Sequence, residues 1–205
     1  RTDPMLNSLS GRFLILTMAF VMLAEVLILV PSVARFREDY LLSRLERAQI
    51  ASLALLANEG IDADLEEELL RNAEVYNVVL RRDEARQLVL SSPLPGPIHE
   101  TYDLRGATSW DLIRDALSEL LDPVNRVIRV IGYPVNDAGQ LIEITMQTGP
   151  MRVAMMDYGL RVLALSAVIS VLTAVLLFLA VRQLLVKPIK GVIRGMQLYA
   201  EAPED

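Results

Sequence analysis

The 205-residue sequence has no cysteine, one histidine and two lysines. Without cysteine the chain can form no disulfide and no thiolate metal site. Because His99 is the only histidine, most zinc sites and most catalytic arrangements built on histidine are excluded. The carboxylates are scattered, and no nucleophile–base pair or glycine-rich phosphate loop accompanies them. The residues themselves therefore predict no catalytic centre and no cofactor site.

Apolar residues, by contrast, make up 53% of the chain and gather in two long runs. The first, residues 13–32, contains one charge, Glu25; the second, residues 160–181, is free of charge from residue 162 onward. A helix of about 20 residues rises about 30 Å, the thickness of the hydrocarbon core of a bilayer. We therefore predict a membrane protein with transmembrane helices over these two runs.

A cleaved signal peptide is the alternative interpretation of the first run. Ser32-Val33-Ala34 resembles the small-residue cleavage signature of such peptides. However, the run is longer than their usual apolar region of about 7–15 residues, and a helical pattern continues beyond it. We therefore favour a retained span.

Basic residues flank the two predicted spans on one side of the membrane. Arg12 precedes the first span, and the second is followed by Arg182, Lys187, Lys190 and Arg194. Because such residues stay in the cytoplasm, residues 1–12 are predicted to form a cytoplasmic tail, and residues 182–205 lie on the same side. The intervening residues 33–158 hold 13 Arg against 21 Asp plus Glu and should form an extracytoplasmic domain. Its acidic balance does not support nucleic-acid binding.

Glu25 is an acidic residue within a predicted span, where such groups face protein more often than lipid. At a similar depth the second span carries one polar stripe at helical spacing, formed by Ser166, Ser170 and Thr173. One hypothesis is that a protonated Glu25 hydrogen-bonds to this stripe, in its own subunit or a partner, as an intramembrane coupling element. The alternative is that Glu25 reaches interfacial water.

The outer domain is predicted to begin with a helix over residues 33–58 that continues from the first span. It has two apolar stripes: Leu41, Leu45, Ala48, Ala51 and Leu55 on one face, and Ile50, Leu53, Ala54 and Ala57 on another. One face suits the domain core and the other a twin helix in a homodimer, although a single wide core face fits equally well.

An acidic helix is predicted next, over residues 63–74, with Asp62 as its N-cap. Asp62, Asp64 and Glu66 are weak candidates for binding a divalent cation, since such ions take carboxylate oxygens. The glycine turn of a calcium loop is missing, and acidic residues in a first helical turn are favoured by the helix dipole. We therefore favour a cap and a solvated face.

The remaining segments predict an antiparallel α+β domain. A hairpin is expected over residues 75–90, and proline and glycine mark a loop over residues 93–105. A capping box at Thr108–Asp111 opens a helix that ends at Asp122-Pro123. A second hairpin is expected over residues 126–148, with Ile142, Ile144 and Met146 on one face.

Four residues of this domain are candidates for lining a ligand pocket, namely Tyr102, Arg105, Trp110 and Tyr133. Arg105 would then meet an anionic group of the ligand. The alternative, which we favour, places Trp110 and Tyr133 in the core and Arg105 in solvent.

The last residues, RQLLVKPIKGVIRGMQLYAEAPED, have a basic pair around Pro188-Ile189. Apolar residues then follow at steps of three and four: Ile189, Ile193, Met196 and Tyr199 or Ala200. This pattern resembles the first helix of a HAMP linker, in the variant found in many proteobacterial sensor histidine kinases. The order of elements in residues 33–158 is similar to that of periplasmic PAS-like sensor domains.

The resemblance implies two transmembrane helices flanking a PAS-like α+β sensor domain, truncated within the HAMP linker. It also implies a homodimer in a bacterial inner membrane with both termini cytoplasmic. For a longer parent protein it implies a kinase core that uses ATP and Mg²⁺ and a response regulator as partner. A chemotaxis transducer, a cyclic-dinucleotide enzyme and a two-span scaffold without signalling output remain as alternatives.

Overall fold

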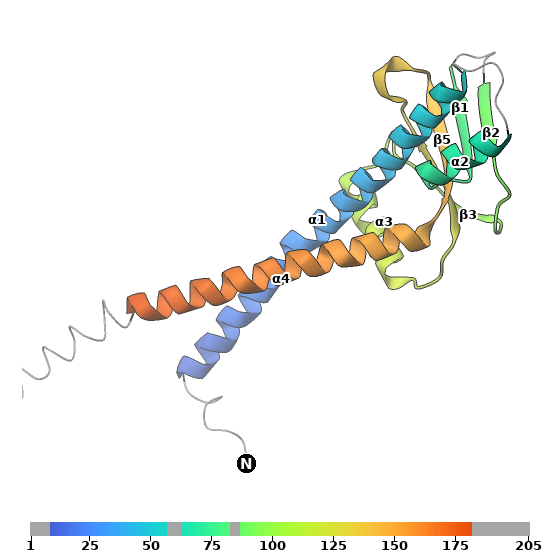
Figure 1. The fold of residues 1–205 in the computed structure, drawn as a ribbon. Helices are drawn as coiled ribbons and strands as arrows, with labels where there is room; N and C mark the ends of the chain where they lie inside the picture. The colour runs from blue at the N-terminus through green and yellow to red at the C-terminus, as the bar shows by residue number, and fades with distance from the viewer. Residues whose placement is uncertain (1–8, 57–62, 83–86, 182–205) are drawn as a thin grey trace, which may run out of the picture. The chain divides into compact units, whose positions relative to one another are not determined.

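The computed structural model describes residues 9–56, 63–82 and 87–181 (Figure 1). The chain divides into two compact units, residues 1–160 and residues 161–205. The first unit holds the sheet and all helices except the C-terminal part of the last one.

Helix α1 (Leu9–Leu56) runs for 48 residues without interruption, with Pro31 inside it. The prediction that a helix continues beyond the first apolar run is confirmed. The first predicted stripe of this helix lies in the core, because Leu41, Leu45, Ala48, Ala51 and Leu55 are all buried. In the second stripe Ile50 is 62% exposed and Ala54 is exposed, whereas Leu53 is half-buried and Ala57 lies outside the described residues.

Five strands form one sheet: β1 (Asn77–Arg81), β2 (Gln87–Ser91), β3 (Ile98–Asp103), β4 (Val127–Gly132) and β5 (Leu141–Gln147). Their order is β2-β1-β5-β4-β3. The pairs β1–β2, β1–β5 and β4–β5 are antiparallel, which confirms both predicted hairpins.

The third strand corrects the sequence prediction in two respects. Residues 93–105 were expected to form a loop, but Ile98–Asp103 is a strand at the edge of the sheet. This strand pairs with β4 in parallel, so the sheet is mixed rather than antiparallel. The cause is helix α3 (Ser109–Leu121), which joins β3 to β4 and returns the chain to the same end of the sheet.

One face of the sheet packs against α1. Its central residues are Val78, Leu80, Val130, Ile142 and Ile144, all of which are buried, and α1 contacts β1, β4 and β5. At Gly132 the helix comes close to the strand, since an added Cβ would lie 2.5 Å from the Leu45 Cδ1 atom. The absence of a side chain at this position therefore permits the helix to sit directly on β4.

Capping interactions are seen at the end of α2 and at the start of α3. Helix α2 (Ala63–Ala73) ends where Glu74 adopts a positive φ of 54° and the N–H of Val75 donates to the Leu70 carbonyl (3.1 Å). This is the geometry of a Schellman cap. The predicted capping box of α3 is confirmed, with the Thr108 hydroxyl accepting from the Asp111 N–H.

Helix α4 (Thr148–Val181) begins directly after β5. Its first turns belong to the core, where Met151 and Met155 are buried. From Leu163 to Leu176 its large apolar side chains are exposed. Over Thr148–Leu176 it is the one helix of the described residues that is long and apolar enough to cross a membrane.

Candidate ligand pocket and buried charge cluster

A polar cavity of about 650 Å³ lies between β3, the following loop and α3. Residues on both elements line it, among them Glu100, Tyr102, Asp111, Asp115 and Ser118. Of the four predicted pocket residues, Tyr102 is the one that lines this cavity. A volume of this size accommodates a small molecule.

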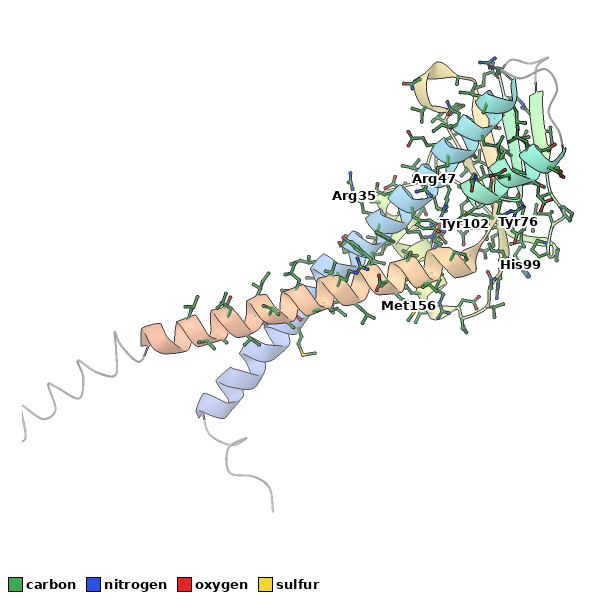
Figure 2. All side chains as sticks on the ribbon, viewed as in Figure 1. Arg35, Arg47, Tyr76, His99, Tyr102 and Met156 are labelled. Atoms are coloured by element: carbon green, nitrogen blue, oxygen red, sulfur yellow. The ribbon has the colours of Figure 1, made fainter. Side chains whose placement is uncertain are left out.

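Tyr102 is held from two sides. Its hydroxyl donates to a carboxylate oxygen of Glu100, and the Cζ atom of Arg37 lies 4.3 Å from its ring centroid. Burial, with the Glu100 hydrogen bond as the next cause, raises the pKa of Tyr102. The ring therefore stays neutral and presents its face to the Arg37 guanidinium, as in a cation–π pair. Figure 2 shows Tyr102 beside α1.

Arg37 projects from α1 into the core and is 1% exposed. Its Nε and Nη2 atoms are buried and have no hydrogen-bond partner among the described residues. Buried guanidinium groups usually pair with carboxylates or carbonyls, because an unmet donor costs about 1–3 kcal/mol, and more when charged. The position is therefore energetically unfavourable in this arrangement.

Glu119 is an acidic residue that is buried as well. It lies on α3, is 8% exposed, and lines a small cavity together with Thr148. Burial is the main cause that raises its pKa, while Thr148, Arg37 and Arg152 act in the opposite direction. The Arg152 Nη2 donates to the Leu120 carbonyl (3.2 Å), whereas its buried Nε has no partner among the described residues.

A small cavity of about 60 Å³ adjoins these groups and is lined by His99, Glu100, Tyr102, Glu119 and Thr148, among others. His99 sits where the register between β3 and β4 shifts, which leaves this residue outside the regular pairing. Such bulges re-aim side chains. The cavity is large enough for water and too small for a drug-sized ligand.

The other three predicted pocket residues lie apart from the cavity linings. Arg105 pairs with Asp103, with Nη2 to Oδ2 at 2.6 Å, and this hydrogen bond lowers the pKa of Asp103. The Arg105 Cζ atom lies 5.9 Å from the Tyr133 ring centroid. Trp110 and Tyr133 are 77% and 66% exposed, so the preferred prediction that they belong to the core was wrong.

No group of three or more potential metal ligands of the His, Cys, Asp or Glu type occurs among the residues with described placement. Asp64 and Glu66 fall in the first turn of α2, as expected for acidic residues near a helix N-terminus. Asp62 lies outside the described residues. Glu66 also accepts a hydrogen bond from the Ser91 N–H (3.2 Å), which ties α2 to β2.

Helices α1 and α4 contact each other at the edge of the first unit. The hydroxyl groups of Ser32 and Tyr158 are 2.8 Å apart. The Phe36 and Tyr158 rings stack with centroids 4.4 Å apart and an interplanar angle of 12°. Ser32 is the last residue of the first predicted span, while Phe36 and Tyr158 lie just outside the predicted spans; we call these two contacts the α1–α4 clasp.

For the predicted intramembrane stripe of Ser166, Ser170 and Thr173, we describe one hydrogen bond, that of Thr173. The Thr173 hydroxyl donates to the Ile169 carbonyl one turn earlier (2.8 Å), so it is satisfied within α4. The hypothesis that Glu25 bonds to Ser166, Ser170 or Thr173 stays a prediction. The HAMP positions Pro188, Ile189, Ile193, Met196 and Tyr199 lie outside the described residues.

The buried charges were missed by sequence reasoning, although a signal existed. Arg37 falls on the same helical stripe as Ala34, Leu41 and Leu45, and a charge on a core stripe marks either a salt bridge or a site. Glu119 likewise follows Ala116 by three residues on the inner face of α3.

Comparisons of the chain with protein-family models, curated proteins and solved structures gave no match.

Proposed function

We propose that this chain is the input half of a homodimeric transmembrane receptor, a sensor histidine kinase, that passes an extracytoplasmic cue through its second span. The observation that carries the proposal is the continuity of two helices. Helix α1 and helix α4 each run without a break from the core of the α+β domain into an exposed apolar segment. A shift in the domain core therefore moves helices that also form the predicted spans.

The exposure of side chains supports membrane insertion of both segments. On α4 the exposed apolar residues extend from Leu163 to Leu176. On α1 the residues between Phe20 and Ile28 include large apolar side chains of 53–72% exposure, such as Leu27 at 65%. Apolar surface of this extent is unfavourable in water and favourable in lipid. The first span remains part of the proposal.

The second apolar stripe of α1 supports the homodimer. Ile50 is 62% exposed, Ala54 is exposed, and Leu53 between them is half-buried. A parallel pairing of two α1 helices would cover this face and hold two copies with their spans side by side. The α+β domain would then act as a PAS-like sensor on the periplasmic side of an inner membrane.

The output is proposed from the resemblance of residues 182–205 to a HAMP helix. An apolar stripe beyond Pro188 would enter a parallel four-helix bundle in the dimer, and movement of α4 would change its packing. A kinase core with ATP and Mg²⁺, and a response regulator, belong to the proposed longer protein.

A chimera tests the relay. Residues 1–205 are joined in frame to the second HAMP helix and kinase core of a histidine kinase, and phosphorylation of its response regulator is measured in membranes. Pro188→Gly and single-residue insertions after residue 186 are expected to change the basal phosphorylation level several-fold, because they alter the phase between span and bundle. An insertion after Gly96, an open loop position, is the control. Unchanged phosphorylation across the junction variants would rule out the relay.

A further inference from the structure

At the junction of α1, α3 and α4, Arg37 and Glu119 are both buried, and each lies next to Tyr102: Arg37 over its ring, and Glu119 in the lining of the same small cavity. Arg37 on α1 leaves two guanidinium atoms without acceptors among the described residues, and Glu119 on α3 is buried and lines a small cavity together with Tyr102 and Thr148. No salt bridge within 4.0 Å is formed between them in the described arrangement. A buried ion and a buried carboxylate that influence each other gain from pairing only if both are charged.

A neutral Glu119 would account for the lack of an ion pair between the two groups. The Thr148 hydroxyl accepts from the Arg126 N–H (3.1 Å), and Thr148 lines the same small cavity as Glu119. A protonated carboxyl group needs no counter-ion, and Arg37 then rests on the face of the Tyr102 ring. Burial raises the pKa of Glu119, which favours the same protonation state.

We propose that Glu119 is a proton-binding site whose occupancy decides whether Arg37 stacks on Tyr102 or pairs with Glu119. When Glu119 releases its proton to solvent, a buried carboxylate remains beside the unpartnered donors of Arg37. Forming the ion pair then satisfies both groups, and the side chain of Arg37 leaves the Tyr102 ring. The described arrangement is the proton-bound one, and extracytoplasmic acidification is the stimulus that stabilises it.

Several other charged or titratable groups surround Glu119 and affect the pH at which it binds a proton. They are Arg37 on α1, His99, Glu100 and Tyr102 on β3, Asp122 at the end of α3, Arg126 before β4, and Arg152 on α4. Because histidine is also a proton-binding side chain, the experiment includes a variant in which His99 is replaced.

The position of this site links the proton to both helices that lead to the membrane. Thr148 is the first residue of α4, and Arg152, one turn later, donates to the α3 backbone at Leu120. Arg37 lies on α1, one residue from Phe36 of the α1–α4 clasp. A movement of Arg37 toward α3 would therefore change the relation of α1 to the start of α4. The inference rests on the proposed receptor function for its consequence, but the proton site is testable without it.

Spin-label distance measurement tests the switch on the chain of residues 1–205 in phospholipid nanodiscs. Because the chain has no cysteine, Arg35→Cys on α1 and Leu121→Cys on α3 give two specific labelling sites. Both side chains are exposed, and Figure 2 shows Arg35 pointing away from the domain. Labelled chains are diluted with unlabelled ones so that distances within one chain dominate. The distance distribution is recorded from about pH 4 to pH 8, which brackets the ordinary Glu pKa of about 4.3 and values above it.

We expect two distance populations whose ratio changes with pH, with a midpoint above the ordinary Glu pKa. Glu119→Gln should hold the acid population at every pH, and Arg37→Gln should abolish the change by removing the partner. The matched control His99→Asn should keep it. A distribution that does not change with pH, a change that persists in Glu119→Gln, or a change lost in His99→Asn would each overturn the proposal. Circular dichroism checks that every variant is folded.

The outcome is independent of the relay. If the distances respond as expected but the chimera shows no change in phosphorylation at the HAMP junction, the proton site stands and the receptor function fails. If the distances do not respond but the junction variants change phosphorylation, the receptor stands and acidification is not its stimulus through Glu119.

Discussion

The side-chain amide of Gln49 makes two hydrogen bonds with the main chain of Val135. Its Nε2 donates to the Val135 carbonyl (2.8 Å), and its Oε1 accepts from the Val135 N–H (2.7 Å). Gln49 is 6% exposed on α1, and Val135 opens the 3₁₀ turn Val135–Asp137 between β4 and β5. The two hydrogen bonds join the C-terminal part of α1 to the turn between β4 and β5. They give partners to a backbone N–H and a carbonyl that are not paired with another strand.

Replacing Gln49 by Leu should therefore destabilise the domain by about 1–3 kcal/mol, because the Val135 N–H loses its acceptor and the Val135 carbonyl keeps only the longer bond from the Ala138 N–H (3.4 Å). Thermal unfolding in detergent, followed by circular dichroism, measures the effect. Gln140→Leu is the control, since that side chain is exposed and its residue is held through its backbone N–H. Equal unfolding temperatures for the two variants would contradict the role of the Gln49 amide.

Glu74 combines a strained backbone with an ion pair. Its φ of 54° is unfavourable by about 1–2 kcal/mol for a residue with a side chain, while its carboxylate lies 2.5 Å from Arg44 Nη2. Glu74→Ala loses the ion pair and keeps the strain, whereas Glu74→Gly loses the ion pair and relieves the strain. We expect Glu74→Gly to be more stable than Glu74→Ala by about 1 kcal/mol in chemical denaturation. If Glu74→Ala were the more stable variant, the positive φ at residue 74 would not be a source of backbone strain.

Gly139 approaches the backbone of β1. A Cβ atom there would lie 2.6 Å from the Arg81 carbonyl oxygen, and the next residue, Gln140, donates its N–H to that same oxygen (2.8 Å). Gly139→Ala should destabilise the domain by about 1–3 kcal/mol, because backbone must move to make room. Gly106→Ala, where no atom lies within 4 Å of the added Cβ, is the matched control and should be nearly neutral. A neutral Gly139→Ala would exclude this close approach in solution.

The α1–α4 clasp makes a prediction about coupling. Tyr158→Phe removes the hydroxyl that meets Ser32 and keeps the ring stacked on Phe36. We expect a loss of about 0.5–1.5 kcal/mol in stability, with Ser32→Ala costing a similar amount. In the double variant the losses should not add, because the two substitutions remove the same hydrogen bond. Full additivity in this cycle would mean that the two hydroxyl groups do not interact.

Sequence reasoning succeeded where structure is set by neighbouring residues. The capping box at Thr108 and the stop at Asp122 depend on groups three or four positions apart, and both are visible in the sequence. Strand β3 was missed because it is a polar edge strand whose pairing with β4 depends on a distant segment. Trp110 was misplaced because its size suggested burial, whereas it lies in the first turn of α3 facing solvent. Arg37 and Glu119 become neighbours of Tyr102 only when α1 and α3 pack against the sheet, and the spacing of apolar residues along the sequence does not predict that packing.

The buried carboxyl group of Glu119 finally predicts how stability depends on pH. Because its pKa is raised in the folded state, the folded chain holds this proton more tightly than the unfolded chain does. Its contribution to stability is therefore complete below the unfolded pKa of about 4.3 and is lost as pH rises through the higher folded value. Glu119→Gln resembles the protonated form at every pH, so its stability should match that of the wild type in acid. As pH rises, the wild type should fall increasingly below the variant until Glu119 is fully ionised. Urea denaturation at a series of pH values measures the difference; a gap between the two chains that does not change with pH would show that Glu119 titrates normally.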